Sequence, residues 1–93
     1  MNFTRVLAES GLTKIELGQL FGVSRQSIHG WAAGHPPREN SLLARQAEVI
    51  TQALVKLIDM RQLPWAAMDR GVRASRITKM AERLQALKPA PIK

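Results

Sequence analysis

The chain has 93 residues, no cysteine and a formal net charge of +7. This length supports one domain with a modest core, and the lack of thiols excludes disulfides, thiolate metal sites and cysteine nucleophiles. No stretch approaches the roughly 18–20 consecutive apolar residues of a membrane span, so we expect a soluble cytoplasmic protein whose basic character favours nucleic acid as its partner.

Three helices are predicted early in the chain, over residues 3–9, 13–22 and 24–34, because apolar residues recur there at helical spacing. The second opens with Thr13 and Glu16, the spacing of a capping box in which each side chain satisfies a backbone N–H of the first turn. Ser24 is a favourable N-cap for the third helix. No segment shows the alternation of a strand, so the predicted fold class is all-α.

A long fourth helix is predicted over residues 40–61, where apolar residues cover about half of the circumference. One small helical unit is too short to cover such a face, so we expect a homodimer interface that uses Leu43, Ile50, Leu54 and Leu57. Burial within the same chain is the alternative. After Pro64 we predict a short helix over residues 65–70, a basic helix over 74–87 and a loose tail over 88–93.

The basic charge is concentrated in the last third of the chain. Residues 61–93 carry eight Lys or Arg and two Asp or Glu, against six and five in residues 1–60. Candidates for phosphate contact on the last helix are Arg73, Arg76, Lys79 and Arg83. A solvated basic surface without a ligand is the alternative.

Residues 13–34 meet the physical requirements of a helix-turn-helix. Gly22 tolerates the left-handed backbone of a tight turn, and Gly18 permits close approach of the two helices. Trp31 shares the inner face of the second helix and is interpreted as a core residue, whereas Gln26 and His29 make the outer face polar and narrow. An outer face of this kind can enter the major groove of DNA.

The same region resembles the helix-turn-helix of phage Cro and repressor proteins and their bacterial relatives, over the stretch LTKIELGQLFGVSRQSIHGWAAG of residues 12–34. The resemblance implies that DNA bases are read by Arg25, Gln26, Ser27 and His29. It implies that phosphates are held by Lys14, Ser24 and Arg38. Gly18 departs from the alanine usual in that family, Gly30 departs from a base-reading side chain, and the family's compact fourth and fifth helices are not recognisable after Gly34.

Two parts of one compact domain are therefore predicted: a helix-turn-helix unit over residues 1–38, and a dimerising, core-completing region over 39–93. The predicted function is a sequence-specific transcriptional regulator, a repressor that binds a short inverted repeat of double-stranded DNA as a homodimer. The alternative is an antitoxin-like adaptor whose long apolar helix binds a protein partner while the motif regulates its own operon.

Other functions are not indicated. The chain offers no recognisable nucleophile, acid–base pair or metal constellation, since its two histidines, His29 and His35, lack a third ligand. We expect no enzymatic activity, no cofactor and no membrane association. A fainter echo of the motif places Gly71 where the first copy has Gly22, and this echo is either a second, degenerate helix-turn-helix or a coincidence of helical spacing.

Overall fold

The computed structural model describes residues 2–61 and 68–87 of the chain. These two ranges contain five helices. They are α1 (Phe3–Glu9), α2 (Lys14–Phe21), α3 (Arg25–Ala32), α4 (Leu42–Asp59) and α5 (Arg70–Ala86). No strand occurs in these two ranges, so the predicted all-α class is confirmed. The first three helices agree closely with the predicted segments.

Polar caps define where α2 and α3 begin. The Thr13 hydroxyl accepts a hydrogen bond from the backbone N–H of Glu16 at 3.2 Å, and the Glu16 carboxylate accepts one from the N–H of Thr13 at 2.8 Å. The predicted capping box is therefore confirmed. The Ser24 hydroxyl accepts from the N–H of Ser27 at 3.1 Å. Each bond satisfies an N–H that has no partner within the first helical turn.

The fourth helix is shorter than predicted at both ends. It begins after Ser41, whose hydroxyl accepts from the N–H of Ala44 at 3.1 Å. Asn40 lies outside the helix in a left-handed conformation, with a φ of 64°, and Arg61 beyond the other end has a φ of 55°. Neither residue can continue a right-handed helix in that conformation.

The fifth helix begins four residues earlier than predicted. Met68 and Asp69 are not helical, and α5 starts at Arg70 where the predicted short helix should end. Gly71 lies in the first turn of α5, so it makes no turn between two helices, and its echo of Gly22 is a coincidence of helical spacing. The rest of the predicted short helix and the predicted tail lie in residues 62–67 and 88–93, outside the described ranges.

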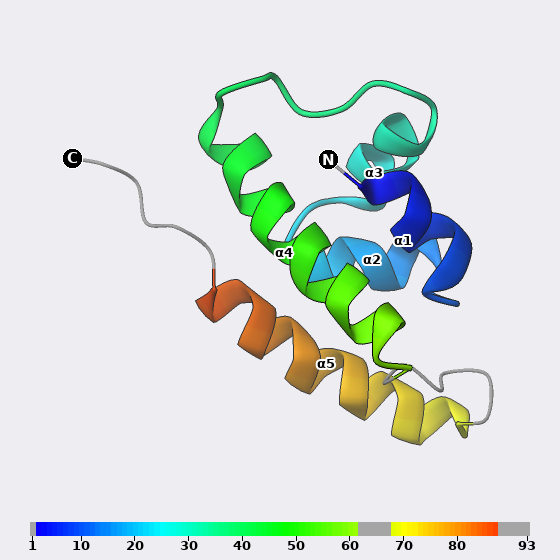
Figure 1. Cartoon of the computed structure of the whole chain (residues 1–93). Coiled ribbons are helices and arrows are strands. Elements are labelled where there is room, and N and C mark those ends of the chain that lie inside the picture. Colours follow the sequence, from blue (N-terminus) through cyan, green and yellow to red (C-terminus); the bar gives the residue numbers. More distant parts are fainter. Residues whose placement is uncertain (1, 62–67, 88–93) are drawn as a thin grey trace.

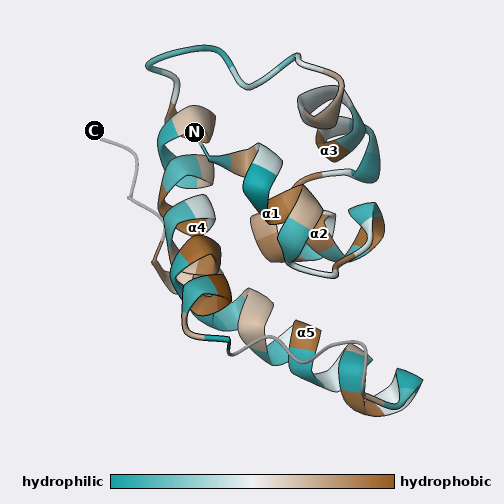
Figure 2. Ribbon diagram, turned by 45° about the vertical axis from the view of Figure 1, so that its right-hand side comes forward, coloured by the Kyte–Doolittle hydropathy of each residue, from teal (hydrophilic) through white to brown (hydrophobic). Residues whose placement is uncertain are grey.

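The second helix occupies the centre of the molecule. It packs against α3, α4 and α5, while α1 packs against α3 and α4. Figure 1 shows α3 and α5 on opposite sides of α2, and the turned view of Figure 2 shows the same order. The recognition unit predicted from the sequence and the basic C-terminal helix therefore meet through α2.

Three aromatic rings join the N-terminal helices. Phe3 of α1, Phe21 of α2 and Trp31 of α3 form three edge-to-face pairs with ring centroids 5.5–5.6 Å apart. Such pairs contribute about 0.5–1.5 kcal/mol each beyond the burial of their area. Trp31 is only 9% exposed, as its predicted place in the core requires. The remaining buried apolar side chains are Val6, Leu12, Leu17, Leu20, Ile28, Ala47, Ile50, Leu54, Ile77 and Leu84.

The apolar side of α4 is used largely within the chain. Ile50 and Leu54 have no exposed surface because α1, α2 and α5 cover them, so in this fold they cannot form an interface with a second copy. Leu57 is half-buried against the same core. Of the four predicted interface residues, Leu43 alone is exposed, at 39%. A protein partner bound along α4, the alternative prediction, could not contact Ile50 and Leu54 either.

Candidate nucleic-acid interface

The turn between α2 and α3 brings two backbone segments into direct contact. Gly22 ends α2 in the left-handed conformation, with a φ of 72°, and the N–H of Val23 donates to the carbonyl of Gly18 at 2.9 Å. A β-carbon on Gly18 would lie 2.9 Å from the carbonyl oxygen of Val23, closer than such atoms approach in proteins. The turn therefore accounts for glycine at position 18.

The outer face of α3 carries long polar side chains at its first turn. Arg25 and Gln26 are both exposed there, and Gln26 lies on the side of the helix away from the fully buried Ile28. The N-terminal residues of a recognition helix are the ones that reach base edges in the major groove. A guanidinium and an amide at this place suit guanine O6 and N7 and adenine N6 and N7 respectively.

The hydroxyl groups of Ser24 and Ser27 are already engaged in local contacts. Ser27 is half-buried, and its hydroxyl lies 3.1 Å from that of Ser24. The Ser24 hydroxyl already accepts from the N–H of Ser27, so its first role is to cap α3. The carbonyl of Ser24 also accepts from the N–H of Ile28, at 3.2 Å. Gly30, farther along the helix, has no atom within 4 Å of the place where a β-carbon would stand.

Two of the predicted contact residues meet across the helix crossing. The ammonium nitrogen Nζ of Lys14, the first residue of α2, lies 2.9 Å from Nδ1 of His29 on α3. His29 is exposed and Lys14 is half-buried. The sequence placed both residues at the DNA surface but had no means of pairing them, because their contact depends on how α2 crosses α3.

Arg38 lies apart from this pair, in the segment that joins α3 to α4. Its side chain is exposed, and its carbonyl accepts from the N–H of Ser41 at 3.1 Å. That bond belongs to the turn that leads into α4. The guanidinium of Arg38 is thus presented from a backbone held by the cap of the next helix.

Arg73 of α5 is bound to α2. Its Nε donates to Oε2 of Glu16 at 2.7 Å, and its Nη2 donates to Oε1 of Glu16 at 2.6 Å. The same Nη2 donates to the carbonyl of Gly11 at 2.8 Å, in the turn between α1 and α2. Arginine and carboxylate thus form a two-pronged pair whose geometry is fixed at both ends.

This pair changes the interpretation of both residues. The side chains of Arg73 and Glu16 are only 22% and 16% exposed. The sequence suggested that Arg73 is a phosphate contact, but in the structure it links α5 to α2. Its hydrogen bonds hold the pKa of the Glu16 carboxyl below its ordinary value, and the carboxylate in turn raises the pKa of Arg73. Glu16 serves α2 twice, as part of its capping box and as the anchor for α5.

A second polar contact ties the far end of α5 to α2. The side-chain amide of Gln85 donates to the carbonyl of Leu20 at 2.8 Å, near the end of α2. Leu20 is in the last turn of that helix, where carbonyls lack partners within the helix. Between Arg73 and Gln85, the apolar side chains of Ile77 and Leu84 are buried. Nothing in the local sequence pattern predicted either polar contact.

Three of the basic residues predicted on α5 remain available. Arg76, Lys79 and Arg83 are exposed, and none of them forms an ion pair with another residue in ranges 2–61 and 68–87. Their spacing places them along one side of the helix, away from Ile77 and Leu84. Of the four basic residues predicted to contact phosphate, these three stay exposed, together with Arg70 in the first turn of the helix.

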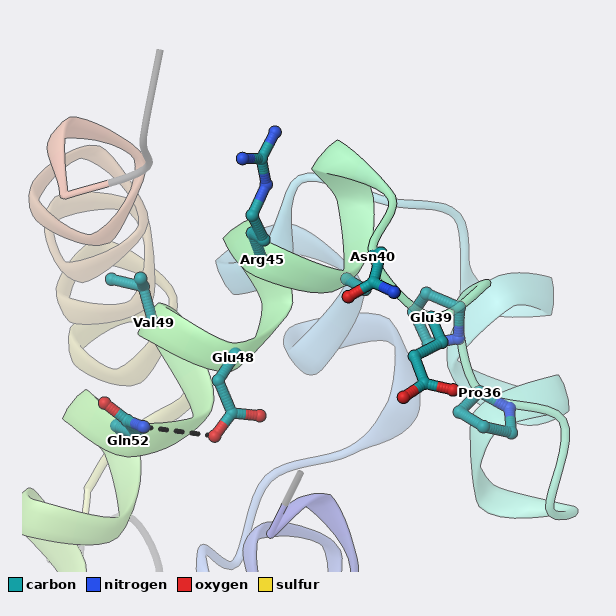
Figure 3. A pocket seen from close by; sticks show the side chains of 9 residues that line it. Pro36, Glu39, Asn40, Arg45, Glu48, Val49 and Gln52 are labelled. Atoms are coloured by element: carbon teal, nitrogen blue, oxygen red, sulfur yellow. Dashed lines mark hydrogen bonds between the residues drawn. The ribbon is translucent and has the colours of Figure 1, made fainter. Parts of the chain in front are cut away.

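An open groove of about 760 Å³ lies between the α3–α4 segment and the first half of α4 (Figure 3). It combines the rings of Pro36 and Pro37 with Val49 and with polar side chains such as Arg45 and Glu48. Glu48 accepts from the side-chain amide of Gln52 at 3.1 Å across one wall. Nothing in this mixture of groups selects one class of ligand.

Comparisons with known proteins give this chain no relative: no family model, no curated protein and no solved structure matches it. Within ranges 2–61 and 68–87, no group of three or more His, Asp or Glu side chains could hold a metal ion. No helix in the same ranges is both long and apolar enough to cross a bilayer. The site must therefore be interpreted from its own geometry.

Proposed function

We propose that this chain is a sequence-specific DNA-binding transcriptional regulator, of the repressor type, that places α3 in the major groove. The observation that carries the proposal is the exposed polar face of α3, displayed by the left-handed turn at Gly22 and opposite a fully buried Ile28. Arg25 and Gln26 stand at the end of α3 from which such helices read base edges.

The roles divide between base reading and phosphate binding. Arg25 reads guanine and Gln26 reads adenine, and each two-pronged contact discriminates against a wrong base by about 1–3 kcal/mol. Arg38, exposed in the segment after α3, holds a phosphate. Arg76, Lys79 and Arg83 add a second set of phosphate contacts if the DNA extends past α2 towards α5.

Two further features support the proposal. The stretch 12–34 resembles the helix-turn-helix of phage Cro and repressor proteins, and the formal net charge of +7 suits a polyanionic ligand. As in that family, we propose that two copies bind an inverted repeat. The surface that joins the copies lies outside Ile50 and Leu54, because the chain's own core covers both.

Selection of bound sequences from a pool of random duplexes at physiological salt tests the proposal. The expected result is one enriched inverted repeat, whose half-site spacing reports the geometry of the dimer. In the Arg25→Ala variant, affinity for this site falls by about 1–3 kcal/mol and its specificity relaxes. Arg45→Ala, which removes an exposed arginine from α4, is the matched control and leaves the preferred sequence unchanged. Binding without an enriched sequence, lost steeply with salt, would contradict the proposal.

A further inference from the structure

The contact between Lys14 and His29 restricts the state of the histidine ring. A lysine ammonium has three hydrogen-bond donors and no acceptor. At 2.9 Å from Nζ of Lys14, Nδ1 of His29 must therefore be the acceptor and carry no proton. A ring whose Nδ1 accepts is the neutral tautomer, with its single proton on Nε2.

The second ring nitrogen is on the exposed side of α3. His29 is exposed, and it stands one helical turn after Arg25, on the same side of the helix. With Nδ1 turned back towards α2, Nε2 at the opposite edge of the ring points away from it. His29 thus offers one hydrogen-bond donor, and no acceptor, to whatever lies against α3.

We propose that Lys14 is a positioning residue, which fixes the Nε2–H tautomer of His29 so that His29 reads a hydrogen-bond acceptor on a base edge. This inference rests on the proposed function of α3. It gives Lys14 a different part from the phosphate contact that the family resemblance implies, because an ammonium held by His29 acts on DNA through the imidazole.

The base that fits best is guanine. Its major-groove edge presents two acceptors, N7 and O6, whereas adenine and thymine each present one, N7 or O4, and cytosine presents only the N4 amino donor. A donor-only imidazole therefore favours guanine and rejects cytosine at the base pair that it faces. Arg25, one turn earlier, is also donor-only and also suits guanine, so the two side chains together call for acceptor-rich edges at neighbouring steps.

A double-mutant cycle on the operator selected by the wild-type chain tests the inference. The variants are Lys14→Met, which keeps most of the side-chain length but removes charge and donors, His29→Ala and the double variant. Each is titrated against the operator and against versions with every base pair exchanged in turn. Arg38→Met is the control for a residue proposed to contact only phosphate, and thermal melting of each variant shows that the fold is kept.

The expected effect is confined to the preference at one base pair of the operator. Lys14→Met loses a several-fold preference for guanine over cytosine at one base pair, on the scale of one hydrogen bond to a base. In the His29→Ala background it has no further effect on that preference. Arg38→Met weakens all duplexes by the same factor. The inference is overturned if Lys14→Met instead weakens all duplexes equally and lowers the slope of affinity against salt by about one contact.

A measurement without DNA separates this inference from the proposed function. Long-range ¹H–¹⁵N spectra of the free chain report which imidazole nitrogen carries the proton, and we expect Nε2–H for His29. Protonation at Nδ1 would overturn the inference and leave the function of α3 intact. A wild-type chain that enriches no duplex sequence, while its His29 keeps the Nε2–H form, would overturn the proposed function and with it the base that His29 reads.

Discussion

The helix-turn-helix region, residues 13–34, and the C-terminal helix α5 are held in place by different kinds of contact. Within the first region, the caps at Thr13 and Ser24 and the left-handed Gly22 act over a few residues. By contrast, α5 is held by bonds that join residues 57 and 65 positions apart, from Arg73 to Glu16 and from Gln85 to Leu20. A helix-turn-helix can therefore be recognised from local sequence, whereas the packing of α5 against it cannot.

The sharpest test of the local region is Gly18→Ala. Alanine is a better helix former than glycine by about 1 kcal/mol, but here its β-carbon would stand 2.9 Å from the carbonyl of Val23. Moving a backbone carbonyl in a tight turn costs more than the propensity gains, so we expect the free energy of unfolding to fall by about 1–3 kcal/mol. Urea denaturation measures this change. An unchanged or raised midpoint would mean that the turn yields easily.

The next test breaks the long-range attachment of α5. Arg73→Met removes both bonds to Glu16 and leaves that carboxylate partly buried without its partner, so the free energy of unfolding should fall by about 1–2 kcal/mol. Arg76→Met is the matched control on the same helix, because Arg76 is exposed and has no ion pair with another described residue. Equal effects of the two variants in urea denaturation would show that the Arg73–Glu16 pair does not stabilise the fold.

The sequence was informative where a physical requirement is local. Thr13 and Glu16 predict a capping box by spacing alone, and the side chain of Gln26 faces outwards because Ile28 must face inwards. Where two neighbouring residues can both cap a helix, as with Asn40 and Ser41, the pattern does not choose between them.

Contacts between distant segments were beyond the reach of the pattern. An apolar stripe such as that of α4 looks the same whether it is covered by its own chain or by a second copy, and burial of Ile50 and Leu54 shows which applies. A basic residue on a helix face, such as Arg73, gives no local sign that it is paired. The approach of Lys14 to His29 depends on the crossing of α2 and α3, a property of packing and not of composition.

The Arg73–Glu16 pair that holds α5 also predicts that the free energy of unfolding depends on pH. The Glu16 carboxyl has a folded-state pKa below its ordinary value, chiefly because Arg73 donates to it, so between that pKa and the ordinary value of about 4.3 the unfolded chain binds more protons. This part of the stability is complete above the ordinary value and is lost as pH falls through the folded pKa.

The measurement is the difference in unfolding free energy between the wild-type chain and Glu16→Gln, compared at neutral pH and below pH 4 or so. The difference should shrink in acid, and it should shrink less in an Arg73→Met background, where the chief cause of the lowered pKa is gone. If the difference stays constant with pH, Glu16 does not contribute to the acid sensitivity of the fold.

The smallest expected effect returns to α3 and separates stability from function. Gly30 is helical and has no atom within 4 Å of a β-carbon position, so Gly30→Ala should raise the free energy of unfolding by up to about 1 kcal/mol, opposite in sign to Gly18→Ala in the neighbouring helix. Because packing does not require glycine here, an added methyl group on the outer side of α3 can be resisted only by a ligand. We therefore expect Gly30→Ala to melt higher than the wild type yet bind the selected operator less tightly. If affinity rises or stays the same, DNA does not approach α3 closely at Gly30, and the proposed base-reading surface ends before this position.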